Sequence, residues 1–144
     1  MSAEAETKDA DASRRQSRRA AVMLLYQEDI TGHAMDDIVT QHERDANRPL
    51  PAYSRQLIDG VHEHQARLDS EIDALAEGWS IERIAPVERA VLRVGLLELD
   101  QDDPPAPVAM AEAVALARRY ASPEAAAFVN GILSAAARTR GKGR

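Results

Sequence analysis

The 144-residue chain contains no cysteine, which excludes disulfide bonds and thiolate metal sites. Aromatic residues make up only 3% of it, so the core must be built mainly from aliphatic side chains and alanine. No run of about 18 apolar residues is present, so we expect no membrane span. Residues 1–13 lack the apolar segment of a signal peptide. These absences are typical of a cytoplasmic protein.

Signatures of an enzyme are also absent. There is no glycine-rich phosphate-binding loop and no catalytic cysteine. His62 and His64 are two residues apart on an expected helix and face different sides, so they cannot hold one metal ion together. The acidic pairs Asp36-Asp37 and Asp102-Asp103 are expected to be solvated, because nothing indicates their burial. We therefore expect neither catalysis nor a bound metal or cofactor.

Charge is distributed unevenly along the chain, although the net charge is only −6. Residues 1–13 carry −3, residues 14–19 (RRQSRR) carry +4, and residues 138–144 carry +4, which leaves −11 on residues 20–137. Basic segments attract polyanions, and an acidic body could attract a basic protein. We expect residues 1–13 to be disordered and residues 138–144 to form a solvated basic tail. The Arg run should be ordered, because it leads directly into an apolar helix.

Hydrophobic periodicity predicts an all-α protein of six or seven helices without a sheet. The expected helices run from about Ser13 to Ile30, over 35–46, from Tyr53, over 68–76, over Pro86–Leu99, over Val108–Tyr120 and from Ser122 onward. Loops are expected at 47–51, 80–85 and 102–107. The segment Pro86–Leu99 is apolar around almost its whole axis, so we expect it to be central and buried.

The last expected helix contains the sequence FVNGIL, residues 128–133. Ser122 is a good N-cap, and Pro123 suits the first turn that follows it. Gly131 costs a helix about 1 kcal/mol relative to alanine, which suggests that another backbone comes close there. Asn130 is correspondingly expected to be a buried amide with a specific partner.

The four arginines of the run are spaced to form one basic stripe on a helix (Arg14, Arg15, Arg18 and Arg19). They have no apparent partners in their own segment, and near a helix start they oppose the helix dipole. Such a conflict between charge and structure is expected at functional sites. Arginine binds phosphate and stacks on bases, which favours a nucleic-acid partner. The alternative interpretation is a solvated helix start without function.

Three segments together resemble the NusB family of bacterial transcription antitermination factors: RRQSRRAAVMLLYQ, PVERAVLRVGLLEL and AEAVALARRYASPEAAAFVNGIL. The resemblance covers residues 14–137 and implies two three-helix bundles packed across each other. It implies binding to the single-stranded boxA element of nascent RNA, together with NusE, a small-subunit ribosomal protein. Within the transcription elongation complex, the pair would support processive transcription of ribosomal RNA operons.

The same resemblance assigns roles to individual residues. RNA binding is implied for Arg14, Arg15, Arg18 and Arg19, with Glu124 and Phe128 near the RNA surface. Tyr26 and Glu88 match positions that face NusE. The sequence departs from the family pattern at Gln16, where a basic residue is frequent, and at Leu97, where tyrosine is common.

Two alternative functions remain open from the sequence. Ribosomal RNA cytosine methyltransferases carry a NusB-like N-terminal domain, although a chain ending at Arg144 leaves no room for a methyltransferase domain. A helical adaptor that binds only protein is the second alternative. A homodimer is possible, because the family includes both monomers and dimers.

Overall fold

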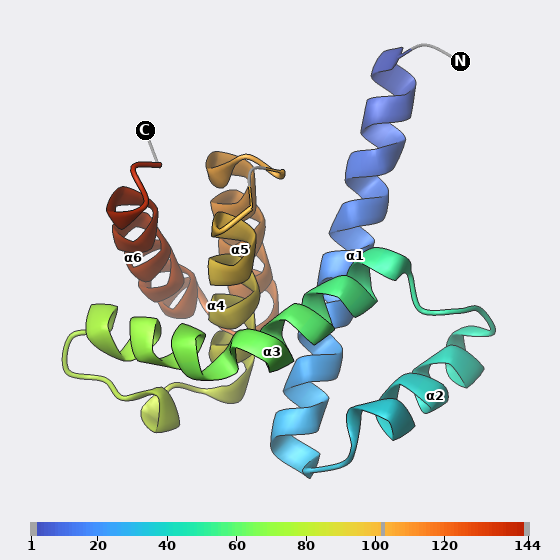
Figure 1. Ribbon diagram of the computed structural model, residues 1–144, viewed down its shortest axis with the longest axis horizontal. Coiled ribbons are helices and arrows are strands. Elements are labelled where there is room, and N and C mark those ends of the chain that lie inside the picture. The colour runs from blue at the N-terminus through green and yellow to red at the C-terminus, as the bar shows by residue number, and fades with distance from the viewer. Residues whose placement is uncertain (1–2, 102, 143–144) are drawn as a thin grey trace. The chain divides into compact units, whose positions relative to one another are not determined.

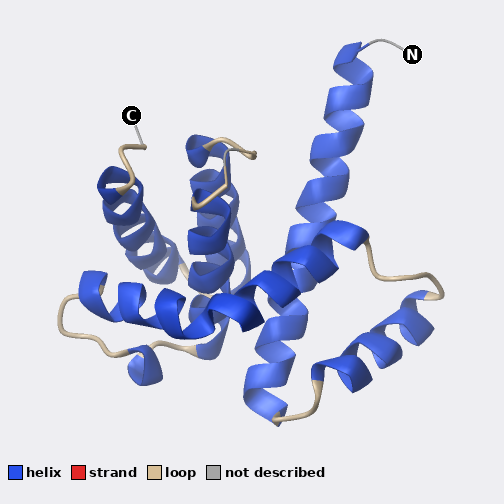
Figure 2. Cartoon of the chain, viewed as in Figure 1, coloured by secondary structure: helices blue, strands red, loops and turns tan. Residues whose placement is uncertain are grey.

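The computed structural model describes residues 3–101 and 103–142. Throughout these residues the regular structure is helical, and no strand occurs among them (Figure 2). The helices are α1 (Ala3–Thr31), α2 (Met35–Ala46), α3 (Ala52–Leu75), the short 3-10 helix η1 (Ile81–Arg83), α4 (Pro86–Leu99), α5 (Ala106–Tyr120) and α6 (Pro123–Thr139) (Figure 1). The predicted all-α class is confirmed. Residues 1–2, 102 and 143–144, which the sequence analysis placed in the tails and a loop, lie outside the described residues.

The chain divides into two compact units, with the boundary inside α3 between Ile58 and Asp59. The first unit holds α1, α2 and the start of α3, and the second holds the rest of α3 with η1 and α4 to α6. We expected two helices between Tyr53 and Ala76, but α3 is continuous. No proline interrupts this segment, and Gly60 is held inside the helix by packing, because a Cβ there would lie 2.7 Å from Cδ2 of Leu97.

Helix α1 begins at Ala3, whereas we expected a helix start near Ser13 and disorder before it. The segment AEAETKDADAS contains no glycine or proline, and it places alanine and acidic residues where a helix begins. The Arg run therefore lies inside the helix rather than in its first turn. The expected conflict with the helix dipole is removed, because that effect is confined to the terminal turn.

Helix α4 is the core of the second unit, as predicted. Its residues Ala90–Leu92 and Val94–Leu99 are buried, and it contacts both α5 and α6 (Figure 1). The closest approach occurs at Gly95, where a Cβ would lie 3.0 Å from Cδ1 of Leu133 and 3.6 Å from Cβ of Ala113. A side chain at position 95 would therefore separate the helices.

The expectations for Asn130 and Gly131 are wrong. Both residues are exposed, and no neighbouring atom lies within 4 Å of where a Cβ on Gly131 would be. The apolar residues Val129, Ile132 and Leu133 of α6 are buried, so Asn130 and Gly131 fall on the outward face of the helix. The glycine that permits close helix packing is Gly95 in α4, and Leu133 of the FVNGIL segment packs against it.

This difference between the two glycines is testable. We expect Gly131→Ala to raise the free energy of unfolding by about 1 kcal/mol, because alanine favours an exposed helix and meets no neighbour. We expect Gly95→Ala to gain less or to destabilise, because Leu133 must move to admit the methyl group. Chemical denaturation of both variants measures the contrast. Equal effects of the two substitutions would contradict the packing described for Gly95.

Two cations of the C-terminal basic segment, Arg140 and Lys142, are bound to the second unit rather than solvated. The Arg140 side chain is 15% exposed, and its Nη2 donates to Oε1 of Glu71 at 2.7 Å while its Nε donates to Oδ1 of Asp100 at 2.8 Å. The hydrogen bonds with Glu71 are the main cause that raises the pKa of Arg140. Lys142 Nζ donates to the carbonyl oxygens of Leu99, at 2.8 Å, and Gln101. For Arg140 and Lys142 these contacts correct the expected solvated tail, because Arg140 pairs with the carboxylates of Glu71 and Asp100 and Lys142 caps the last carbonyl group of α4.

We expect Arg140→Ala to lower the free energy of unfolding by about 2 kcal/mol, because it removes the partner of the partly buried Glu71 and leaves Asp100 with Arg67 alone. Arg138→Ala is the matched control, since Arg138 lies on the same helix end but is exposed. That control should change stability by less than about 0.5 kcal/mol. Thermal or urea unfolding distinguishes the two variants, and an equal loss in both would refute the role assigned to Arg140.

Candidate functional site

The Arg run of α1 is joined to the start of α3. Ser54 Oγ donates a hydrogen bond of 2.7 Å to the carbonyl oxygen of Ser17, and both residues are buried. The guanidinium of Arg14 lies over the ring of Tyr53, with its Cζ 4.8 Å from the ring centroid. These contacts hold the run in a defined place on the first unit.

The four arginines of the run differ in exposure. Arg15 is exposed and Arg14 and Arg19 are half-buried, whereas Arg18 is only 3% exposed. Arg14, Arg15 and Arg18 each make interactions within the chain, and the ring that Arg14 contacts lies outside the Arg run, in α3. We call Arg14, Arg15 and Arg19 the Arg face, because these three reach the surface.

The burial of Arg18 has a reason that is visible in the sequence. Arg18, Val22 and Leu25 follow one another at helical spacing, and Val22 and Leu25 are 0% and 6% exposed. Arg18 therefore continues the buried stripe of α1 toward its N-terminus. Extending the apolar periodicity backwards from Val22 would have revealed this.

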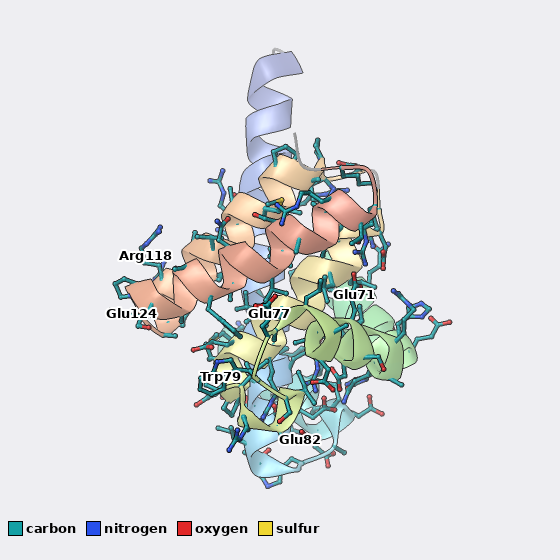
Figure 3. All side chains as sticks on the ribbon, turned by 90° about the vertical axis from the view of Figure 1, so that its left-hand side faces the viewer. Glu71, Glu77, Trp79, Glu82, Arg118 and Glu124 are labelled. Atoms are coloured by element: carbon teal, nitrogen blue, oxygen red, sulfur yellow. The ribbon has the colours of Figure 1, made fainter. Side chains whose placement is uncertain are left out.

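A pocket of about 360 Å³ lies in the second unit and contains three of the residues singled out from the sequence. Glu88 comes from the first turn of α4, and Glu124 and Phe128 come from α6. Trp79 and Arg83, which the sequence analysis did not select, also line it, with Ile84, Ala85, Ser122 and Ala125. We call this the Trp79 pocket. Figure 3 shows Trp79 and Glu124 on the same face of the unit.

Tyr26 is not among the residues that line the Trp79 pocket. It lies on α1, in the first unit, and is half-buried. Within the second unit, Glu88, which the resemblance assigns to the protein partner, shares a pocket with Glu124 and Phe128, which it assigns to the RNA surface.

Side chains of two neighbouring helices hold one wall of the Trp79 pocket. Asp73 Oδ1 of α3 accepts a hydrogen bond of 2.6 Å from the backbone N–H of Ile81. Arg89 Nη1 of α4 donates to the carbonyl oxygens of Ile81, at 3.3 Å, and Ile84, at 2.9 Å, and also reaches that of Glu82. The segment 81–84, which we expected to be a loop, is thus held by hydrogen bonds at Ile81 and at Ile84.

The opposite wall is formed by the start of α6. Ser122 caps this helix as predicted, since its Oγ accepts a hydrogen bond of 3.0 Å from the N–H of Ala125. The cap fixes the first turn, which carries Glu124. Phe128 follows one turn later, is half-buried and lines the pocket. The pocket is therefore formed by restrained elements on both sides.

The Trp79 pocket combines aromatic walls with negative charge. Trp79 is 52% exposed, an unusual exposure for so large an apolar side chain. Two carboxylates, Glu88 and Glu124, line the pocket with one guanidinium, that of Arg83. Among the described residues, neither carboxylate makes a hydrogen bond or an ion pair. Burial raises the pKa of Glu88, which means that its charge is incompletely solvated.

This pKa shift predicts that Glu88 lowers stability at neutral pH. Because the pKa is higher in the folded than in the unfolded chain, the stability associated with protonated Glu88 is lost as pH rises through the folded pKa. We expect Glu88→Gln to raise the melting temperature at pH 7 and to have no such effect at a pH low enough to protonate Glu88.

Glu82→Gln is the matched control for this prediction, because Glu82 is exposed, lies nearby and does not line the pocket. It should give no pH-dependent gain. A lower melting temperature of Glu88→Gln at pH 7 would show instead that the attraction between Glu88 and the N-terminus of α4 outweighs its desolvation.

Two further properties concern all described residues. None of their helices is both long and apolar enough to cross a membrane. No group of three or more histidine, cysteine, aspartate or glutamate side chains among them is placed to hold a metal ion.

The fold and the two sites define a class of protein: an all-α binding protein with a basic helix face on one unit and an aromatic, acidic pocket on the other. The sequence model of the NusB family matches residues 15–138. The transcription antitermination protein NusB of Thermobifida fusca is 37% identical over 123 residues, covering 85% of this chain and 87% of that protein. NusB of Bacillus velezensis is 41% identical over 122 residues, covering 84% of this chain and 92% of that protein. The chain belongs to the NusB family.

Solved structures agree with this assignment. NusB of T. maritima superposes with a TM-score of 0.76 at 32% identity, covering 87% of this chain and 90% of that one. A chain in a crystal structure of the antitermination factors NusB and NusE in complex with dsRNA gives a TM-score of 0.77 at 28% identity, covering 88% and 96%. The fold expected from the resemblance is therefore confirmed as that of the family.

Proposed function

We propose that this protein is a transcription antitermination factor that binds boxA-type nascent RNA together with NusE and supports processive transcription of ribosomal RNA operons. The observation that carries the proposal is the division of charge on a NusB-family chain. The Arg face offers cations to a polyanion, and the Trp79 pocket offers unpaired carboxylates to a basic partner. The solved complex of relatives contains partners of both kinds, a ribonucleic acid and NusE.

In this proposal the protein binds and does not catalyse, and it acts in the cytoplasm, where nascent RNA is made. The Arg face contacts RNA phosphates. Arg18 is buried, so its contribution is to the packing of α1, which positions the Arg face. Tyr26 and Glu88 face NusE. The approach of RNA to Glu124 and Phe128 stays a prediction, which the negative charge of the Trp79 pocket does not favour.

Salt dependence of RNA binding tests the role of the Arg face. If Arg14, Arg15 and Arg19 each contact one phosphate, they contribute a slope of about −2 to log affinity against log salt, from about −0.7 per contact on single strands. We expect the Arg15→Ala, Arg19→Ala double variant to make the slope shallower by about 1.4 units. Binding should weaken for all sequences alike, because phosphate contacts do not specify bases.

The measurement is a fluorescence-anisotropy titration of boxA RNA across a salt series, with NusE present. Single-stranded and duplex RNA should both be used, since the solved complex of relatives contains dsRNA. The Arg44→Ala, Arg48→Ala double variant is the matched control, because both residues are exposed and the change in net charge is the same. If both double variants leave the slope unchanged, the protein-only adaptor becomes the better interpretation.

A further inference from the structure

We propose that the acidic N-terminal part of α1, residues 3–12, is an autoinhibitory element that competes with RNA for the Arg face. We call these residues the acidic segment. The inference deepens the proposed function and rests on it for the nature of the ligand, which is RNA. It concerns regulation: the chain carries an anionic competitor beside its own cations, so RNA that is attracted only weakly is not retained.

The charge of the acidic segment is opposite to that of the run that follows it. Residues 3–12 contain four carboxylates and one lysine, a net charge of −3, and residues 14–19 carry +4. The match to the NusB family covers residues 15–138, so the acidic segment lies outside the matched part of the chain. A charge that nearly balances the Arg run therefore accompanies it from outside the region shared with the family.

The helix keeps the acidic segment close to the Arg run. Helix α1 is continuous from Ala3 to Thr31 (Figure 1), and Ser17 Oγ donates a hydrogen bond of 2.8 Å to the carbonyl oxygen of Ser13 at the junction. At a rise of about 1.5 Å per residue, Asp11 precedes Arg15 by about 6 Å along the helix axis. The Debye length at physiological salt is about 8 Å, so charges at this separation still interact.

Asp11 has the register for a direct ion pair with the Arg face. It precedes Arg14 by three residues and Arg15 by four, the two spacings at which opposite charges on a helix attract each other. An acid on the N-terminal side of a basic residue is also the favourable order. Both arginines make interactions within the chain. RNA phosphate must therefore compete with negative charge at this end of the Arg face.

Helix formation alone does not account for the two aspartates of the acidic segment. Acidic residues are favoured in the first turn of a helix, which explains Glu4 and Glu6. Asp9 and Asp11 lie beyond that turn, where the dipole effect has faded, and aspartate is a weaker helix former than glutamate or alanine. Their place just before the Arg run is the feature that autoinhibition explains.

A basic protein is the competing partner of the acidic segment, because carboxylates attract any cationic surface. The Arg run, however, is joined to the segment in one helix and acts on it at a high effective concentration, whereas a second protein must first bind. The structure therefore favours the contact within the chain, and the experiment below distinguishes the two.

Neutralising the two aspartates tests the proposal. We expect the Asp9→Asn, Asp11→Asn double variant to bind single-stranded oligo(U) RNA about threefold more tightly than the wild type at roughly 50 mM salt, since each charge weakens binding by about 1.5- to 2-fold. The gain should fall below about 1.5-fold at roughly 0.5 M salt, where the Debye length is about 4 Å. Fluorescence anisotropy measures both affinities, and far-UV circular dichroism checks that helix content is retained.

The Asp37→Asn, Asp45→Asn double variant is the matched control. Both residues are exposed on α2 in the same unit, and the change in net charge is the same. This control should change RNA affinity by less than about 1.3-fold, because only the general field of the protein is altered. An equal gain in both double variants would assign the effect to net charge and overturn the proposal.

Single substitutions test the register. Asp9→Asn and Asp11→Asn remove the same charge two residues apart, but only Asp11 stands three and four residues before arginines of the run. We expect Asp11→Asn to give the larger gain in RNA affinity, about twofold. A larger gain from Asp9→Asn, or no gain from either substitution, would contradict the competition described for Asp11.

The remaining outcomes separate this inference from the proposed function. If the wild type binds boxA RNA with NusE and the Asp9→Asn, Asp11→Asn variant binds RNA no more tightly, the inference fails and the proposed function stands. If boxA RNA binds no better than oligo(U) even with NusE, while the variant binds both RNAs more tightly, the inference stands and the proposed function fails. If the variant loses affinity for NusE and keeps that for RNA, the acidic segment serves the protein partner and the inference fails.

Discussion

The burial of helix α4 is the constraint on which the second unit depends. From Ala90 to Leu99 nearly every residue of this helix is buried, with Leu97 against Gly60 of α3 and Gly95 against Leu133 of α6. A helix enclosed in this way must have its terminal carbonyl groups satisfied by other parts of the chain. Lys142 does so for Leu99, the last residue of α4, and also donates to the carbonyl oxygen of Gln101 just beyond the helix. The positive charge of Lys142 is thus explained by helix capping, and that of Arg140 by its pairing with Glu71 and Asp100.

The other end of the same helix has a different character. Where α4 reaches the surface, Glu88 is desolvated without a partner, and the next residue, Arg89, holds the preceding turn through three carbonyl oxygens. One end of the helix is therefore fully satisfied, while the other retains an uncompensated charge beside an exposed tryptophan. A carboxylate that is partly desolvated without a partner is expected where binding, rather than folding, determines the residue.

Local signals in the sequence predicted the elements that depend on local physics. The N-cap at Ser122, the proline at the start of α4 and the apolar surface of α4 all behaved as expected. Features that depend on tertiary contacts were not predicted: the environment of Gly131, the burial of Arg18, and the pocket that joins α6 to the segment before α4. Glu88, Glu124 and Phe128 were selected through a family resemblance, but their association in one pocket could not follow from spacing along the chain.

The buried Arg18 also bears on why a factor of this kind would need a basic partner. Three surface arginines provide a modest, sequence-independent attraction for RNA, and residues 20–137 carry a net charge of −11 that opposes it. A basic protein seated on the acidic body would neutralise part of that charge and add cations of its own. In the proposed complex, protein binding therefore strengthens RNA binding without any change in the Arg face. Linkage requires the converse as well, so RNA should strengthen the attachment of the partner by the same factor.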